Sequence, residues 1–353
     1  MGSAAAYTRA RDSIAQICRS DAGPRTLRLE ALAAIRRAVG FDAYAWLITD
    51  PETSVGSSPL ADVPCLPELP QLIRLKYLTA INRWTGLPRG AVSLSAATGG
   101  ELSQSLMWRE LLQRYQVTDV ASSVYRDRFG CWGFLDLWRT QAPPFTAADI
   151  EFLGDIAGPV TTALRHSQAR TFAPATDAGR LPAGPVVLLL SAALDVRAQT
   201  PQTQRYLRVL VPRDDEDQAP IPASAYNVAA QLIAAETGVD DGPPLARAHL
   251  ASGRWLTLRA ARMGTAQPAQ ERDIAVSIEP AAPTDRVSVF ARACGLTPRE
   301  TELLRQLVTG AATRDIARRM FVSEHTVQDH FKSIFTKTAT RNRRALLARA
   351  LGT

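Results

Sequence analysis

Several features that would define a secreted, membrane or metal-binding protein are missing from this 353-residue chain. Its apolar runs, such as residues 186–190, fall far short of the ~20 residues that a membrane-spanning helix requires. Charged residues interrupt the first 20 positions, so no signal peptide is expected. The four cysteines are far apart and form no CxxC pair, which argues against a zinc site and a disulfide framework. We therefore expect a reduced, cytoplasmic protein with no metal and no cofactor.

Sequence motifs for catalysis are also absent. No G-x-S-x-G nucleophile elbow occurs, and no Gly-Lys pair occurs of the kind that phosphate-binding loops contain. The four histidines cannot form a spaced metal set, and two of them, His325 and His330, fall on one predicted helix near the C-terminus. An enzyme with a nucleic-acid-binding tail is therefore unsupported, and the chain is expected not to be an enzyme.

Positive charge is concentrated at the C-terminal end of the chain. Residues 286–353 contain 13 basic and 5 acidic residues, a net charge of +8, whereas the remaining 285 residues contain 28 basic and 29 acidic residues. Such a basic block indicates a polyanionic partner, because phosphate neutralisation dominates nucleic-acid affinity. The block also has helical apolar periodicity, which a solvated charged tail would lack.

Two proline-rich stretches divide the chain into blocks of domain size. They predict linkers at residues 171–185 and 281–293 and domains at residues 8–170, 186–280 and 294–353. This division agrees with the usual domain length of roughly 100–200 residues. We expect a multidomain α+β protein.

The first block alternates helix and strand patterns. Apolar residues at helical spacing predict a helix over residues 27–39. Period-2 alternation predicts strands over residues 42–49, 121–125 and 130–138. In the last strand, regular alternation would put four side chains on one face, namely Trp132, Phe134, Asp136 and Trp138. Thr146 and Asp149 have the spacing of a capping box at the start of a long final helix, so the block is predicted to be an α/β sandwich.

This first block resembles a GAF domain, through residues 120–137 followed by Pro144-Phe145-Thr146 and the long helix. GAF domains are commonly small-molecule sensors, so the resemblance implies a small apolar or aromatic effector. The block holds 15 of the 23 aromatic residues in the chain, and aromatic walls would suit such a ligand. The candidate pocket residues are Tyr44, Trp46, Trp84, Trp108, Tyr125, Trp132 and Phe134. The alternative is that these aromatics form an ordinary core or a dimer face.

The second block resembles a PAS-like α+β domain. Two apolar strands flank a turn within residues 186–200, and a short helix is predicted over residues 201–207. Alternating patterns predict paired strands over residues 254–260 and 273–279. The block contains a single histidine, His249, which is expected to be structural, and it has no cofactor signature.

The third block predicts four short helices, each with a start signal. Thr297 and Glu300 form a capping box around Pro298, which suits a first helical turn because its missing N–H is not needed there. Gly310 is placed to end this helix in a left-handed cap. Thr313, Ser323 and Thr340 are predicted to be the caps of the other three helices, the last of which spans residues 343–351. A tight turn separates the second and third helices, so together they predict a helix-turn-helix.

The third of these helices has two different sides. An inner stripe is formed by Val327, Phe331, Ile334 and Thr338. The opposite side carries His325, Gln328, Asp329, Lys332 and Thr336. A helix that buries one stripe and exposes hydrogen-bonding groups on the other suits the DNA major groove.

This block resembles the all-α DNA-binding domain of the LuxR family, which also occurs in NarL-type response regulators. The matching positions are residues 296–300, Gly310, 315–317, 322–327, His330, 334–335 and Arg343. The family usually has Lys after Thr-Val where this chain has Gln328, which can pair with an adenine edge. The resemblance implies that Gln328, Asp329 and Lys332 enter the groove. The other expected DNA contacts are His325, Thr326, Thr336 and Lys337, with phosphate contacts by Arg314, Arg341 and Arg343.

The sequence therefore predicts a ligand-responsive transcriptional regulator that acts as a homodimer. Its expected partners are double-stranded operator DNA, RNA polymerase and a small-molecule effector, with no membrane. A phosphorylated response regulator is disfavoured, because Lys76 is the one lysine before the C-terminal block and a receiver domain needs an acidic cluster with a later lysine. An acyl-homoserine-lactone receptor remains an alternative, although such chains usually lack a middle domain. A further alternative is a ligand-independent or protein-partner-controlled regulator whose N-terminal domains only dimerise.

Overall fold

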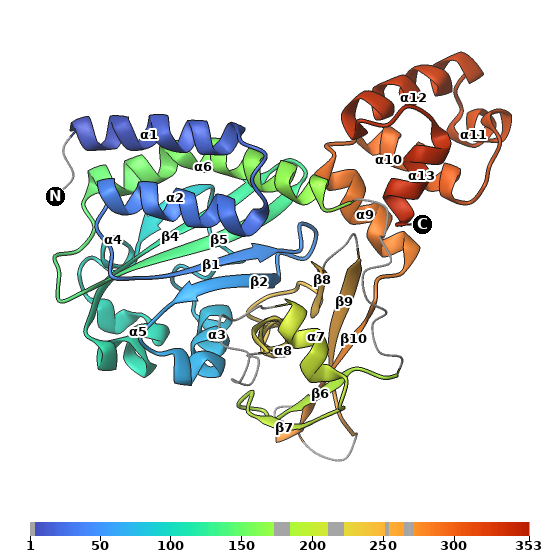
Figure 1. Ribbon diagram of the computed structural model, residues 1–353. Coiled ribbons are helices and arrows are strands. Elements are labelled where there is room, and N and C mark those ends of the chain that lie inside the picture. The colour runs from blue at the N-terminus through green and yellow to red at the C-terminus, as the bar shows by residue number, and fades with distance from the viewer. Residues whose placement is uncertain are drawn as a thin grey trace.

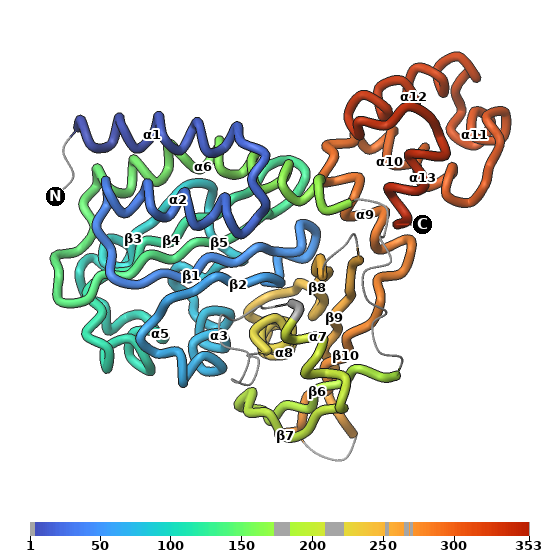
Figure 2. The backbone as a smooth tube through the Cα atoms, viewed as in Figure 1, coloured from blue at the N-terminus to red at the C-terminus, as the bar shows by residue number. Residues whose placement is uncertain are grey.

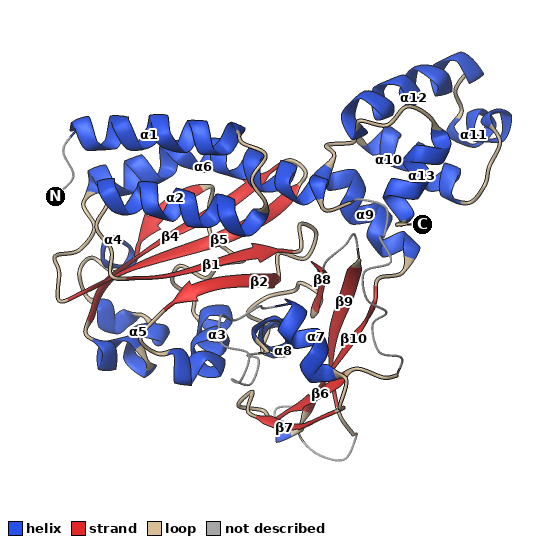
Figure 3. Cartoon of the chain, viewed as in Figure 1, coloured by secondary structure: helices blue, strands red, loops and turns tan. Residues whose placement is uncertain are grey.

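The chain folds into three units that follow one another along the sequence (Figure 1). The computed structural model describes residues 4–172, 184–210, 222–250, 254–264, 268 and 271–352. Two units are built on antiparallel sheets and the third is a cluster of helices at the C-terminus (Figure 3). Within these residues, none of the helices has the length and apolar character that a membrane crossing needs. The expected mixed α/β multidomain fold is confirmed.

The first unit is a five-stranded sheet between helices. Its strands are β1 (Ala43–Thr49), β2 (Gly56–Asp62), β3 (Gly90–Ser93), β4 (Val117–Asp127) and β5 (Gly130–Thr140), in the order β2-β1-β5-β4-β3. One face is covered by α1 (Ala4–Arg19), α2 (Pro24–Ala38) and α6 (Ala147–Arg170). The other side carries α3 (Leu69–Leu78) and α5 (Leu106–Glu110), and the short α4 (Leu94–Ala97) follows β3. The predicted helices and strands of this block and the capping box of Thr146 with Asp149 are confirmed.

A β-bulge corrects the prediction for the aromatic face of β5. The pairing of β4 with β5 shifts register after Tyr125 and leaves Trp132 as an extra residue on β5. Such an extra residue interrupts the two-residue alternation and re-aims the side chains beside it. Trp132 therefore packs in the core beneath α1, α2 and α6, whereas Phe134 and Trp138 pack on the opposite face of the sheet. The predicted common face of Trp132, Phe134, Asp136 and Trp138 is wrong for Trp132.

The second unit repeats the strand order of the first. Its strands are β6 (Val187–Leu190), β7 (Val196–Gln199), β8 (Leu245–His249), β9 (Trp255–Arg262) and β10 (Ile274–Pro280), in the order β7-β6-β10-β9-β8. When the strands of each unit are numbered along the chain, both sheets have the order second, first, fifth, fourth, third. The helices of the unit are α7 (Thr203–Leu210) and α8 (Ala223–Glu236). The strands and helix predicted for this block are confirmed, whereas α8 and β8 had no signal in the sequence patterns.

Helix α8 joins the two sheet-based units (Figure 2). It contacts α3 and β2 of the first unit as well as β8 and β9 of its own sheet. Most of its side chains are buried, which explains why it lacks an amphipathic period. Two of its polar side chains form hydrogen bonds with the first unit. Ser224 Oγ donates to the carbonyl of Ser57 at 2.5 Å, and Asn227 Oδ1 accepts from Tyr77 Oη at 3.1 Å. The two units are thus fixed to each other by buried contacts.

The C-terminal unit has an additional helix before the four that were predicted. Its helices are α9 (Pro283–Ala293), α10 (Pro298–Val308), α11 (Thr313–Met320), α12 (Glu324–Thr338) and α13 (Arg343–Leu351). The linker predicted over residues 281–293 is therefore wrong, because α9 occupies most of it. Pro283 lies in the first turn of α9, where its missing N–H is not needed, and Val289 and Phe290 are fully buried. Most of the other predicted linker, residues 171–185, lies outside the described residues.

The helix start signals of this unit are confirmed in two of four cases. The hydroxyl of Thr297 accepts from the backbone N–H of Glu300, and Ser323 caps α12 in the same way. The predictions for Thr313 and Thr340 are wrong. Helix α11 starts at Thr313 itself, and the side chain of Asn342 caps α13.

All three units meet at Phe172, just after α6. Its ring stacks on Trp255 of β9, with centroids 4.6 Å apart, and lies 5.3 Å from the ring of Phe290 in α9. Arg349 of α13 donates from Nε to the Phe172 carbonyl at 2.9 Å. The C-terminal unit is therefore docked through α9 and α13, whereas α12 packs against α10 and α11 on the side away from the sheets (Figure 1).

Candidate nucleic-acid interface

Helices α11 and α12 form a helix-turn-helix on the outer side of the C-terminal unit (Figure 1). The buried side chains of α11 are Ile316, Ala317 and Met320. Those of α12 are Val327, Phe331, Ile334 and Thr338. The predicted inner stripe of α12 is thus confirmed, and it fixes which side of the helix faces outward.

The outward side of α12 carries a chain of polar contacts. His325, Gln328, Asp329, Lys332 and Thr336 are exposed there, and Thr326 is half-buried beside Ser323. Nδ1 of His325 lies 3.0 Å from one carboxylate oxygen of Asp329, and Nζ of Lys332 lies 3.0 Å from the other. The hydrogen bond from Lys332, together with the neighbouring His325, lowers the pKa of Asp329. This face therefore presents one carboxylate between two groups that can donate.

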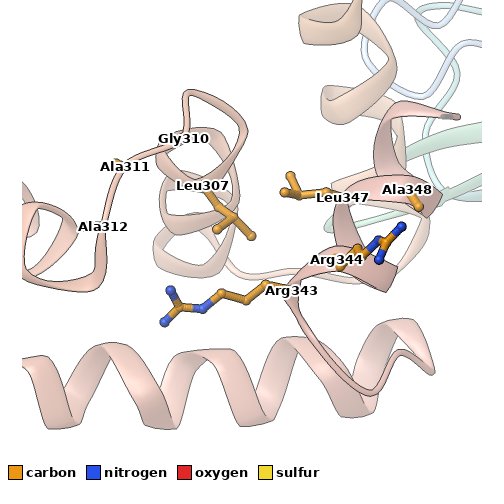
Figure 4. A pocket seen from close by; sticks show the side chains of 8 residues that line it. All are labelled: Leu307, Gly310, Ala311, Ala312, Arg343, Arg344, Leu347 and Ala348. Carbon is orange, nitrogen blue, oxygen red and sulfur yellow. The ribbon is translucent and has the colours of Figure 1, made fainter.

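The predicted cations around α12 fall into two classes. Arg314 and Arg341 are exposed at the surface. Arg343 extends from the start of α13 across α12 (Figure 4), where its guanidinium lies 4.2 Å from the ring centroid of Phe331 and donates to Thr313 Oγ1 at 2.7 Å. It lines a groove that also includes Leu307, Gly310, Ala311, Ala312, Arg344, Leu347 and Ala348 (Figure 4). Arg343 thus ties α11, α12 and α13 together.

Lys337 is likewise engaged inside the domain. Its Nζ lies 2.7 Å from a carboxylate oxygen of Glu300, the buried residue that completes the capping box of α10. Burial alone would raise the pKa of Glu300, but the hydrogen bonds from Lys337, Ser333 and Thr297 lower it to about 2. An ionised Glu300 therefore holds the C-terminal half of α12 on α10, a role that the sequence pattern did not indicate.

The aromatic residues expected to line one pocket lie on both faces of the first sheet. On the face beneath α1, α2 and α6, Trp46 stacks on Tyr125 with centroids 5.3 Å apart, and Trp132 and the half-buried Tyr44 lie in the same core. On the opposite face, Trp84 stacks on Phe134 at 5.7 Å, with Trp108 half-buried nearby. The structure therefore divides the seven candidates between the two faces of the sheet. One group is Tyr44, Trp46, Tyr125 and Trp132, and the other is Trp84, Trp108 and Phe134.

Beside Trp84 lies a buried ion pair that the sequence patterns did not reveal. Nζ of Lys76 is 2.9 Å from Asp136 Oδ2, and the other carboxylate oxygen accepts from Ser122 Oγ at 2.7 Å and Trp84 Nε1 at 3.1 Å. Two features of the sequence could have indicated this pair, namely Asp136 among the apolar residues of β5 and Lys76 among those of α3. Within the described part of the chain, no group of three or more His, Cys, Asp or Glu residues is arranged to hold a metal ion.

Comparison with known families assigns the C-terminal unit. Residues 295–350 match the model of the family described as "Bacterial regulatory proteins, luxR family". The C-terminal unit is a LuxR-family helix-turn-helix domain. Over 48 residues the chain is 48% identical to the CsgBAC operon transcriptional regulatory protein of Escherichia coli K12, and equally to the probable csgAB operon transcriptional regulatory protein of Salmonella typhimurium. This match covers 14% of the chain and 22% of each relative, so the chain spans about a fifth of the length of these proteins.

Several solved structures superpose on the chain at low scores. A crystal structure of Escherichia coli SdiA covers 98% of this chain and 97% of its own, with a TM-score of 0.36 and 11% identity. SdiA in complex with octanoyl-rac-glycerol covers 100% of this chain and 97% of its own, with a TM-score of 0.31 and 12% identity. A Vibrio cholerae VqmA dimer covers 48% of this chain and 83% of its own, with a TM-score of 0.20 and 17% identity.

Proposed function

We propose that the chain is a sequence-specific transcriptional regulator that reads the major groove of operator DNA with α12. The observation that carries this proposal is the division of α12 into a buried stripe and an exposed row of hydrogen-bonding side chains. The buried stripe holds the helix on its neighbours, so the exposed groups keep a fixed spacing. The major groove accommodates one α-helix and displays a distinct donor and acceptor pattern for each base pair.

Each polar group on this face suits a particular partner on DNA. Lys332 donates to the guanine acceptors, Gln328 pairs with an adenine edge, and Asp329 accepts from a cytosine amino group. His325, Thr326 and Thr336 complete the base-facing set, and the exposed Arg314 and Arg341 bind phosphates. Lys337 and Arg343 act as positioning residues, through Glu300 and Phe331 respectively.

The two sheet-based units place the C-terminal DNA-binding domain under the control of a small molecule. Both curated relatives are named as operon regulators, and we extend that role to this chain, with RNA polymerase as a partner and a homodimer as the acting form. On the resemblance of their sequences, the first unit is a GAF-like sensor and the second a PAS-like relay. The effector is apolar or aromatic and binds on the Trp84 and Phe134 face of the first sheet.

The DNA-reading role is tested by selecting binding sites for the full chain from a random duplex pool and measuring affinities by fluorescence anisotropy at fixed salt. Lys332→Ala should weaken binding to the selected site by roughly 10- to 100-fold. The matched control is Arg299→Ala, which removes an exposed cation from α10 instead of α12 and should change the affinity severalfold at most. Equal losses in both variants, or no selected site, would contradict the role of α12.

The effector site is tested by thermal shift of the full chain against apolar and aromatic compounds. A ligand that binds the native state raises its melting temperature and, by linkage, shifts its DNA affinity. Phe134→Leu should remove both responses, whereas Trp46→Phe, on the opposite face, should retain them. A compound whose effects survive Phe134→Leu would place the site elsewhere, and a screen with no such compound would favour N-terminal units that only dimerise.

A further inference from the structure

The turn between α11 and α12 exposes an aromatic side chain that the fold does not use. Phe321 is 94% exposed, far more than the other exposed large hydrophobic residues of the described chain, which lie between 38% and 51%. Its backbone is left-handed, with φ of 55°, a conformation that glycine or asparagine adopts more readily than a bulky residue. Neither burial nor backbone preference therefore accounts for a phenylalanine at this position.

The geometry of this helix end can be made without a side chain. Helix α11 ends in a Schellman-type cap, in which the N–H of Val322 bonds to the carbonyl of Ala317 at 3.0 Å and Phe321 is the left-handed residue. The same bond closes α9 and α10, where the left-handed residues are Gly295 and Gly310. Since glycine serves in those two caps, the ring of Phe321 is not needed to end the helix.

The position of the ring points to DNA as its partner. Phe321 precedes Ser323, the N-cap of α12, by two residues, and the N-terminal part of the second helix of a helix-turn-helix meets the base edges. The exposed residues on either side of the turn include Arg318, Arg319 and His325, with Glu324 as the one exposed acid between Phe321 and His325. An isolated aromatic ring among charged and polar side chains suits DNA, which combines phosphates with the methyl groups of thymine. A protein-binding surface would instead have a wider apolar patch at its centre.

We propose that Phe321 is a specificity-determining residue that packs on the 5-methyl group of a thymine at the edge of the operator. This inference rests on the proposed function of α12. Thymine is the one DNA base with a methyl group in the major groove, and phenylalanine is among the side chains that contact it. The contact would extend readout by α12 to a base pair beyond those reached by its polar face.

The test compares Phe321→Gly with the parent chain on the selected operator. Glycine relieves the left-handed strain, so the variant should melt at the same or a higher temperature while binding the operator roughly three- to tenfold more weakly. Phe321→Asn, which also tolerates this backbone, should behave in the same way. The matched control is Ala339→Gly, which relieves the equivalent strain at the end of α12 and should leave the affinity unchanged.

Replacing each operator thymine by deoxyuridine, which lacks the methyl group, then identifies the contact. One replacement should weaken binding by the parent and have no further effect on Phe321→Gly. Equal affinities of parent and variant, or a weakened variant in which every deoxyuridine effect persists, would overturn the inference. A variant that binds normally but fails to activate transcription would assign Phe321 to a protein partner and also overturn it. If the parent selects no operator at all, the proposed function itself fails.

Discussion

The first sheet and helix α12 use the same kinds of side chain in opposite ways. Nζ of Lys76 lies 2.9 Å from Asp136, and the side chains of the two residues are 2% and 3% exposed. Lys332 and Asp329 are bonded at 3.0 Å, but their side chains are 75% and 54% exposed. A buried pair is part of the core, because either partner left alone is an uncompensated charge, whereas an exposed pair contributes little and is free to rearrange. The first pair is therefore part of the core, whereas the second is exposed and available for the recognition role proposed for α12.

The largest effect that this comparison predicts is the loss of stability caused by replacing Lys76. Lys76→Met leaves Asp136 as a buried charge without its partner, which should lower the free energy of unfolding by about 3–5 kcal/mol. Urea denaturation of the full chain, followed by tryptophan fluorescence, measures the change. The double variant with Asp136→Leu should recover most of the loss. A Lys76→Met variant as stable as the parent would contradict the claim that this buried pair stabilises the core.

A smaller effect is expected at Glu300, whose buried carboxylate supports the exposed helix. The pKa of Glu300 is about 2 in the folded state against 4.5 ordinarily, so its contribution to stability is complete above pH 4.5 and is lost as the pH falls towards 2. Glu300→Gln should therefore reduce the free energy of unfolding by about 2 kcal/mol at pH 7, and the difference from the parent should shrink between pH 5 and pH 2.5. A difference that stays constant over this range would show that Glu300 does not act through its charge.

Local signals were enough to predict four helices of the C-terminal unit and two of their four caps. The capping box of Thr297 and the buried stripe at Val327 and Phe331 depend on residues close in sequence, and both are found in the structure. Helix α9 was mistaken for a linker because of the prolines at its start, although Pro283 is compatible with a first helical turn.

Features that depend on residues far apart could not be predicted in this way. Lys76 and Asp136 are 60 residues apart, so their pairing follows from how α3 packs on the sheet. The bulge that turns Trp132 away from Phe134 arises in the pairing of two strands, and regular alternation cannot show it. Helix α8 is buried on all sides and therefore lacks the period that marks a surface helix.

The smallest of the expected effects concerns Asp329, whose carboxylate faces the proposed DNA site. Asp329→Ala removes a negative charge from this surface, so binding to random duplex should tighten by roughly two- to threefold. Binding to the selected operator should lose discrimination at one base pair, because the carboxylate no longer accepts from a cytosine amino group. Thermal stability should be unchanged. If affinities for operator and random DNA move together, Asp329 reads no base and is merely a partner of Lys332.

The most direct test of the central claim, that α12 reads bases, is a parallel binding-site selection with the parent chain and Gln328→Lys. Glutamine pairs with an adenine edge and lysine prefers the acceptors of guanine, so the consensus should change from A·T to G·C at one base pair in each half-site. All other positions of the consensus should be retained. An unchanged consensus, or a preference lost evenly across the site, would contradict the placement of α12 in the major groove.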